Sequence, residues 1–209
     1  MLIAALAMLS AATSAAEHVK LARVFLVVPP KYPKAGLSPN SNNSTRAKIT
    51  ISPDGKVVRC DIVRESGDAY LDHYACDYFR RARATPAKSR TGQKSFGTIA
   101  QEFSALGGND PNRPPIADVT LAVSHMPTKD KSSEYHFVAV SVDEAGNATD
   151  CDTLSDVSDQ LDTTLCKFAM KQLTFKPALD VSGKPVPSIQ SFVALFTGPD
   201  VPAVIKERR

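Results

Sequence analysis

Four cysteines are the residues of this chain whose type and spacing point to a defined chemistry. They are Cys60, Cys76, Cys151 and Cys166 in a chain of 209 residues. Cys151 follows Cys60 by 91 residues and Cys166 follows Cys76 by 90 residues, so the second pair nearly repeats the spacing of the first. Paired thiols form disulfides in an oxidising compartment, and clustered thiols also bind zinc. The spacing therefore leaves two chemistries to be separated.

The cysteines belong to a longer pattern that occurs twice. A repeat of about ninety residues predicts two small domains of similar fold. Of the three possible cysteine pairings, only Cys60 with Cys76 and Cys151 with Cys166 keeps each bridge inside one copy. Zinc sites more often contain close CxxC pairs, and no histidine recurs with these cysteines, so the pattern favours disulfides. The repeated residues are Gly55, Cys60, Asp61, Leu71, Asp72, Cys76, Pro86, Ala87 and Gly92, then Gly146, Cys151, Asp152, Leu161, Asp162, Cys166, Pro177, Ala178 and Gly183.

The remaining reactive side chains do not form a recognisable catalytic pattern. His18, His73, His125 and His136 stand at positions that do not correspond between the copies, and no motif of a hydrolase, metalloprotease or nucleotide-binding loop occurs. His73 beside Asp72 is the best acid–base pair and defines the weaker hypothesis of a hydrolase. The sequence predicts no catalytic residue, no metal site and no cofactor.

The first sixteen residues resemble a secretory leader. Residues 1–16 carry no charge and change from an apolar stretch to small residues before Glu17, although a basic start is missing. Either the true start lies upstream or the leader is a weak one. We expect a signal peptide at 1–16, export to the periplasm and no stable membrane insertion after cleavage. A net charge of +3 gives no argument for nucleic acid as a partner.

Both copies predict the order strand, strand, helix, strand. In the first, β-branched runs flank the turn 53–55, an amphipathic helix spans 68–84 with Asp68 as its N-cap, and a third strand follows from residue 95. In the second, strands at 134–143 and 147–156 precede a helix at 158–173 and a strand at 187–197. The fold class is α+β. We expect a first module at 17–107, a linker at 108–116, a second module at 117–198 and a tail at 199–209.

These motifs resemble the C-terminal domain of TonB, the periplasmic energy transducer of Gram-negative bacteria. The resemblance rests on Tyr32 to Gly36 (YPKAG), DGKVVRC, Ser66-Gly67, Leu71-Asp72 and the Pro-Ala exit from the helix. The second copy keeps FKPALDVSGKPV, at 175–186, but lacks the Tyr-Pro opening and the Ser-Gly pair. The cysteines are similar to those of alphaproteobacterial-type members. The resemblance implies two tandem modules, each a three-stranded antiparallel sheet packed by one or two helices.

The family also implies what such a protein binds. TonB-like domains take up an extended protein segment, such as one from an outer-membrane receptor in TonB-dependent transport, as an added strand. The last strand of each copy is the expected edge, but these two strands would be hidden if they paired with each other. In that case the chain would be a structural or regulatory envelope protein whose copies pack together. The edge residues are Ser95, Gly97, Ile99, Gln101 and Phe103 in the first copy and Ile189, Ser191, Val193 and Leu195 in the second.

Overall fold

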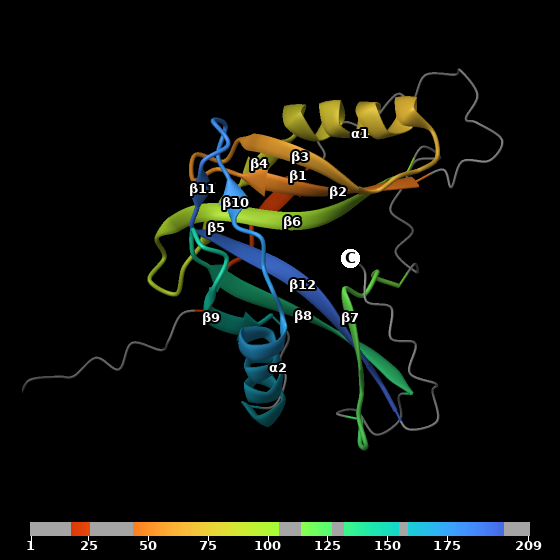
Figure 1. Cartoon of the computed structure of the whole chain (residues 1–209), viewed down its shortest axis with the longest axis vertical. Helices are drawn as coiled ribbons and strands as arrows, with labels where there is room; N and C mark the ends of the chain where they lie inside the picture. The colour runs from red at the N-terminus through yellow and green to blue at the C-terminus, as the bar shows by residue number, and fades with distance from the viewer. Residues whose placement is uncertain (1–17, 26–43, 105–113, 127–131, 155–158, 199–209) are drawn as a thin grey trace, which may run out of the picture.

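The computed structural model describes residues 18–25, 44–104, 114–126, 132–154 and 159–198. Within these ranges two helices pack against a mixed eight-stranded sheet (Figure 1). The main strand order is β3-β2-β6-β12-β8-β9, while β5 and β7 pair with β6 and β12 beside this path. The fold is α+β, as the sequence predicts. The predicted leader (1–16) and tail (199–209) lie outside the described residues.

The N-terminal half contains β2 (Ser44–Ile51), β3 (Val57–Arg64), α1 (Ala69–Arg81) and β6 (Lys94–Ser104). The hairpin β2–β3 turns at Gly55, whose φ of 82° favours glycine. Alternate residues of β2, namely Ala47, Ile49 and Ile51, are fully buried. They pack with Leu71, Ala75 and Phe79 of α1, so the helix covers one face of this part of the sheet.

The helix α1 begins as predicted and ends earlier than predicted. The Asp68 carboxylate accepts hydrogen bonds from the backbone N–H groups of Tyr70 and Leu71 at 2.9 and 3.1 Å, which confirms it as the N-cap. Ala82 already has an extended conformation. Residues Arg83–Thr85 form strand β4 and pair with β1 (Arg23–Phe25), because Pro86 disfavours helix before it and β1 supplies backbone partners.

The C-terminal half has the same order of main elements. It contains β8 (Ser133–Val142), β9 (Ala148–Thr153), α2 (Asp159–Gln172) and β12 (Ser188–Thr197). After α2, the chain crosses β12 and β6 and forms the short hairpin β10 (Ala178–Leu179) and β11 (Pro185–Val186) (Figure 1). The core of this half consists of residues from β8, β9, β12 and α2, including Val138, Val140, Leu165, Ala169 and Phe192.

The two halves meet through parallel pairing of β6 with β12. Residues 96–98 of β6 pair with residues 188–190 of β12, so one sheet runs through both halves. Along β8, Val138 and Val140 belong to the core under α2, whereas Ala139 belongs to the core under α1. Because neighbouring residues of a strand face opposite sides, the two helices cover opposite faces of the sheet.

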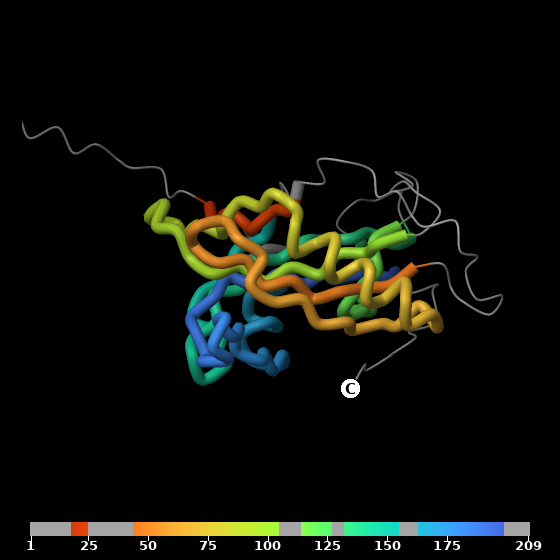
Figure 2. The backbone as a smooth tube through the Cα atoms, turned by 90° about the horizontal axis from the view of Figure 1, so that it is seen from above, coloured from red at the N-terminus to blue at the C-terminus, as the bar shows by residue number. Residues whose placement is uncertain are grey.

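The N-terminal segment 18–25 covers the face of the C-terminal half opposite α2. Val19 and Ala22 are buried in one cluster with Ala139 and Ile189, and Figure 2 shows β1 and α2 on opposite sides of the strands. The segment crosses β6 at Gly97, where an added Cβ would lie 2.4 Å from the Ala22 Cβ atom. Only glycine permits this close crossing.

Candidate functional site

Both predicted disulfides are confirmed. Cys60 in β3 bonds to Cys76 in α1, and Cys151 in β9 bonds to Cys166 in α2, with Cα–Cα distances of 5.6 and 5.5 Å. Each bridge fastens a helix to the outer strand of its hairpin. All four thiols are therefore used, which rules out the zinc alternative at the cysteines. Within the described part of the chain, no group of three or more histidine, cysteine or acidic side chains could hold a metal ion.

The Asp72–His73 pair lies at the entrance of α1 and on its surface. The Asp72 carboxylate accepts a hydrogen bond from the Ser66 backbone N–H at 3.0 Å, which fixes the loop before the helix. The His73 side chain is exposed and lies 3.3 Å from Asp77 on the next turn. These contacts explain both residues as parts of a helix surface and its entry loop.

Strand β12 lies inside the sheet. On one side it pairs with β8 over its whole length. On the other side residues 188–190 pair with β6, and residues 194–197 pair with β7 (Val119–Ala122). Between these ladders, Val193 exchanges hydrogen bonds with Asp118, because its N–H donates to the carboxylate at 2.9 Å and its carbonyl accepts from the Asp118 N–H at 2.8 Å. The second predicted edge, with Ile189, Ser191, Val193 and Leu195, thus occupies a central position.

On the side away from β2, strand β6 is paired with other described strands over its first half only. Ser95 pairs with Ala87 of β5 (Ala87–Lys88), and Gly97 pairs with Ile189. Residues 99–104 keep β2 on one side, while no described strand forms a ladder on the other. We call this stretch the β6 edge. It includes the predicted residues Ile99, Gln101 and Phe103.

The side chains of the β6 edge are less available than its backbone. Phe103 is buried and packs edge to face against Tyr74 and Phe79, with ring centroids 5.8 and 6.1 Å apart. Ile99 packs against the same core. Any partner that binds here would therefore recognise mainly the N–H and C=O groups of the strand.

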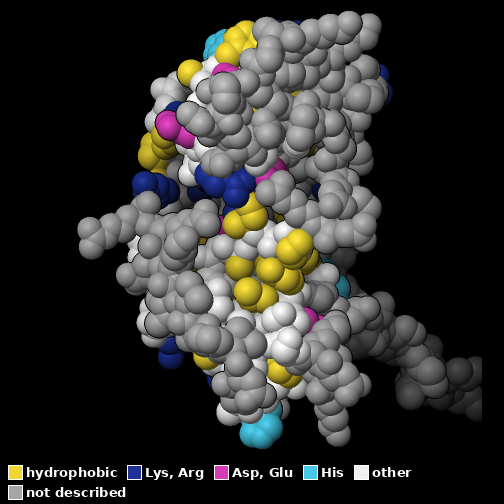
Figure 3. All heavy atoms as spheres, turned by 90° about the vertical axis from the view of Figure 1, so that its right-hand side faces the viewer, with side chains coloured by type: hydrophobic (Ala, Val, Ile, Leu, Met, Phe, Trp, Pro, Cys, Tyr) yellow, Lys and Arg dark blue, Asp and Glu magenta, His cyan; other side chains and the backbone are white. Residues whose placement is uncertain are grey.

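A pocket of about 440 Å³ opens where β6 and β12 diverge. We call it the wedge pocket. Its walls come from β2, β3, β6 and β12, from the chain after α2 and from the residues before β7. Figure 3 views the molecule from the side toward which the two strands diverge, and Lys and Arg side chains lie there directly above a group of hydrophobic ones. Its lining includes Arg46, Lys48, Thr98, Ala100, Lys176 and Gln190.

The basic side chains of the wedge pocket differ in their partners. Arg46 binds the Asp118 carboxylate at 3.1 Å, and Arg64 binds Glu102 at 2.9 Å. The Lys48 ammonium donates to the Gln190 side-chain oxygen at 3.2 Å, and no carboxylate of the described residues lies within ion-pair distance of it. Burial lowers the pKa of Lys48 below its usual 10.5, and nearby Lys176 lowers it further, while Asp61 and Asp118 oppose this.

The floor of the wedge pocket also contains a buried hydroxyl. Thr98 is 2% exposed, and its Oγ1 has no hydrogen-bond partner among the described groups. A buried polar atom without a partner is uncommon and calls for an explanation such as water or a ligand. Sequence reasoning missed Lys48 and Thr98 because alternation assigns them to the face opposite the apolar core, which normally faces solvent. The segments that cover this face, β12 and the chain after α2, come much later in the sequence, so the residues around Lys48 and Thr98 do not indicate them.

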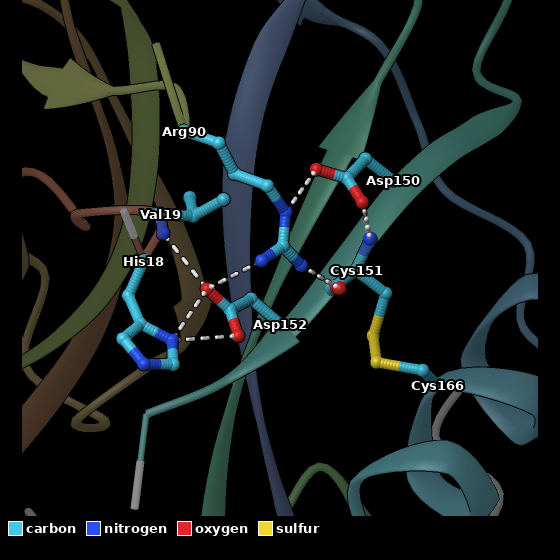
Figure 4. The surroundings of a disulfide bond; sticks show 7 residues. All are labelled: His18, Val19, Arg90, Asp150, Cys151, Asp152 and Cys166. Atoms are coloured by element: carbon cyan, nitrogen blue, oxygen red, sulfur yellow. Dashed lines mark hydrogen bonds and ion pairs between the residues drawn. A yellow bond between two sulfur atoms is a disulfide. The ribbon is translucent and has the colours of Figure 1, made fainter. Parts of the chain in front are cut away.

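A cluster of charges fastens the two halves together near the second disulfide (Figure 4). Arg90, in the turn before β6, donates to the Asp150 carboxylate at 3.1 Å and to the Cys151 carbonyl at 2.7 Å, and lies 3.6 Å from Asp152. Asp152 is buried and also accepts from the Val19 backbone N–H at 2.8 Å. The acidic strand β9 is thus occupied by contacts within the chain.

We expect Arg90→Ala to lower the free energy of unfolding by about 1–2 kcal/mol, because it removes a hydrogen bond to a carbonyl and leaves the buried Asp152 with fewer partners. Urea titration measures this change. Arg80→Ala removes the same charge from an exposed pair within α1, and should cost under about 0.5 kcal/mol. Equal small losses in both variants would show that the junction does not stabilise the fold.

One protein family matches the N-terminal half of the chain. Residues 28–104 match the family model described as Gram-negative bacterial TonB protein C-terminal. These residues belong to the TonB C-terminal domain family. The match covers β2, β3, α1 and β6 and confirms the resemblance for the first copy. No curated protein and no solved structure gives a significant match to the chain.

The TonB C-terminal domain is a periplasmic-type protein-interaction domain, which suggests a TonB-like role in the cell envelope. Two disulfides fit a location outside the reducing cytoplasm. Neither helix in the described ranges is long and apolar enough to cross a membrane.

Proposed function

We propose that this protein is a periplasmic binding protein that takes up an extended segment of a partner protein as an added strand along the β6 edge. The observation that carries this proposal is the half-covered state of β6, since residues 99–104 pair with β2 alone among the described strands. Unpaired backbone groups along such an edge are a template for an incoming strand. An outer-membrane receptor of TonB-dependent transport is the partner that the family suggests.

Amide hydrogen exchange tests the availability of the β6 edge. In the protein without a partner, amides of residues 99–104 should alternate between slow exchange, where they donate to β2, and fast exchange, where they point away from it. A pool of random octapeptides should slow the fast set. Uniform protection without peptide would overturn the proposal, because the edge would already be covered.

A pair of proline variants separates binding from folding. The N–H groups of consecutive strand residues point to opposite sides, so only one of Ala100 and Gln101 directs its N–H away from β2. Proline at that position should weaken octapeptide binding about tenfold while the protein stays folded, and proline at the other should destabilise the sheet. Retained binding in the folded variant would contradict strand addition here.

We also propose that residues 117–198 are a second, divergent copy of the domain. The order β8, β9, α2, β12 parallels β2, β3, α1, β6. A finer detail supports the same origin. A Cβ atom added at Gly55 would lie 2.9 Å from the Ala84 carbonyl oxygen, and one at Gly146 would lie 2.5 Å from the Phe175 carbonyl oxygen. In both places the hairpin turn lies under the chain that leaves the helix.

A structural role in the envelope is the second candidate function. The observation in its favour is that β12, the last strand of the proposed second copy, is paired on both sides. In this alternative the copies cover each other and take up no outside strand. The same hydrogen-exchange experiment distinguishes the two functions, because the alternative requires slow exchange along the whole of β6.

A further inference from the structure

We infer that the wedge pocket is a subsite for a carboxylate group carried by the segment that adds to the β6 edge. This inference rests on the proposed function and names the chemistry of the partner. The pocket begins at Thr98 and Ala100, where the open part of β6 starts. A strand paired with residues 99–104 therefore has one end directly beside the pocket.

The charges of the pocket favour an anion. Its described lining contains four basic side chains, Arg46, Lys48, Arg64 and Lys176, and one acidic side chain, Asp118. Asp118 and the neighbouring Glu102 neutralise the two arginines through close ion pairs. Lys48 is held by an uncharged amide, and Lys176 is exposed beside it. A carboxylate would give Lys48 the close ion pair that no described carboxylate forms with it, since Asp61 and Asp118 act on it only from beyond ion-pair distance.

Two further polar side chains, Thr98 and Gln190, line the same pocket. The buried Thr98 hydroxyl is a free donor among the described groups and lines the pocket. The Gln190 amide nitrogen is already engaged, donating to the Lys176 carbonyl at 2.8 Å, so the Gln190 oxygen is held toward Lys48. Lys48 thus provides the ammonium from which a carboxylate in the pocket would accept, while the Thr98 hydroxyl lies buried in the floor of the pocket.

The pocket also has apolar walls, from Leu173, Phe175 and Phe192. These exclude water around the ammonium and strengthen its attraction for an anion. They also leave room for the aliphatic part of a glutamate or for the last side chain of a peptide. In an antiparallel addition the C-terminal end of the partner lies nearest the pocket, because the open part of β6 starts there. The carboxylate is then either that C-terminus or an acidic side chain close to it.

Peptide selection on the immobilised protein tests the inference. Two pools of random octapeptides are used, one with free C-terminal carboxylates and one with C-terminal amides, and bound peptides are sequenced. We expect either enrichment of the free-carboxylate pool, if the C-terminus enters, or enrichment of Glu and Asp near the end in both pools, if a side chain enters. Binding without either enrichment would overturn this inference and leave strand addition standing, whereas no binding of any peptide would refute strand addition itself.

Lys48→Met identifies the residue responsible. Affinity for a selected carboxylate peptide should fall about tenfold, while affinity for its Gln or amide counterpart stays unchanged. Lys56→Met is the matched control, because it removes the same charge from an exposed turn where Lys56 pairs with Asp54. Methionine suits the buried stem of Lys48, and a urea titration checks that the variant is folded. An equal loss for both peptides, or an equal loss in the control, would show that Lys48 does not select a carboxylate.

Discussion

Removing either disulfide should lower the free energy of unfolding by about 3 kcal/mol, in line with the chain entropy of the loops that they close. The bridges span 16 and 15 residues and join each helix to the hairpin beneath it. The variants are Cys60→Ala with Cys76→Ala, and Cys151→Ala with Cys166→Ala. Urea titrations measure the losses, and the wild-type protein under reducing conditions serves as a comparison.

The two helices should depend on their disulfides to different degrees. Helix α1 also buries Leu71, Ala75 and Phe79, whereas the described side chains of α2 bury Leu165 and Ala169. Loss of the second bridge should therefore release α2 locally, which is visible as fast amide exchange in residues 163–172. Peptide mass mapping provides the independent check of the pairing. A mixed bridge between the halves, or a denaturation midpoint unchanged by reduction, would contradict this account.

Gly146→Ala should destabilise the protein by roughly 3 kcal/mol or more, because two costs act at one position. The φ of Gly146 is +90°, a conformation that costs an L-residue about 1–2 kcal/mol. The added Cβ would also lie 2.5 Å from the Phe175 carbonyl oxygen, a backbone atom that cannot move aside by changing rotamer. Thermal or urea unfolding measures the change.

Gly183 separates these two costs. Its φ is +81°, but an added Cβ would meet no atom within 4 Å. Gly183→Ala should therefore show the backbone cost alone, about 1–2 kcal/mol. Gly55→Ala, with a 2.9 Å approach to the Ala84 carbonyl oxygen, should fall between the two. If Gly146→Ala costs no more than Gly183→Ala, the close contact under the chain after α2 does not exist in solution.

Helix caps and hairpin turns could be predicted because they depend on residues that are neighbours in the sequence. Asp68 caps α1 through its own carboxylate, and Gly55 turns the first hairpin through its own φ. The end of α1 was predicted too late, since the pairing of Arg83–Thr85 with β1 depends on a segment about sixty residues away. Of the candidate site, the sequence indicated the strand β6 and two residues that line the wedge pocket, Ile99 and Ser191. It did not indicate Lys48, Thr98 or Gln190.

The sequence by itself determined the order of the elements, the faces that are apolar and the cysteine partners, because alternation, capping and the repeat are properties of neighbouring residues. Only the tertiary structure decided what lies beside each strand. Parallel pairing of β6 with β12 placed one predicted edge, β12, inside the sheet. The other predicted edge, β6, stayed open along residues 99–104 only. The same pairing also turned Lys48 and Thr98 from an ordinary polar face into the floor of a pocket. Alternation specifies the face on which a side chain lies, but backbone edges are chemically alike, so their pairing depends on the assembled fold.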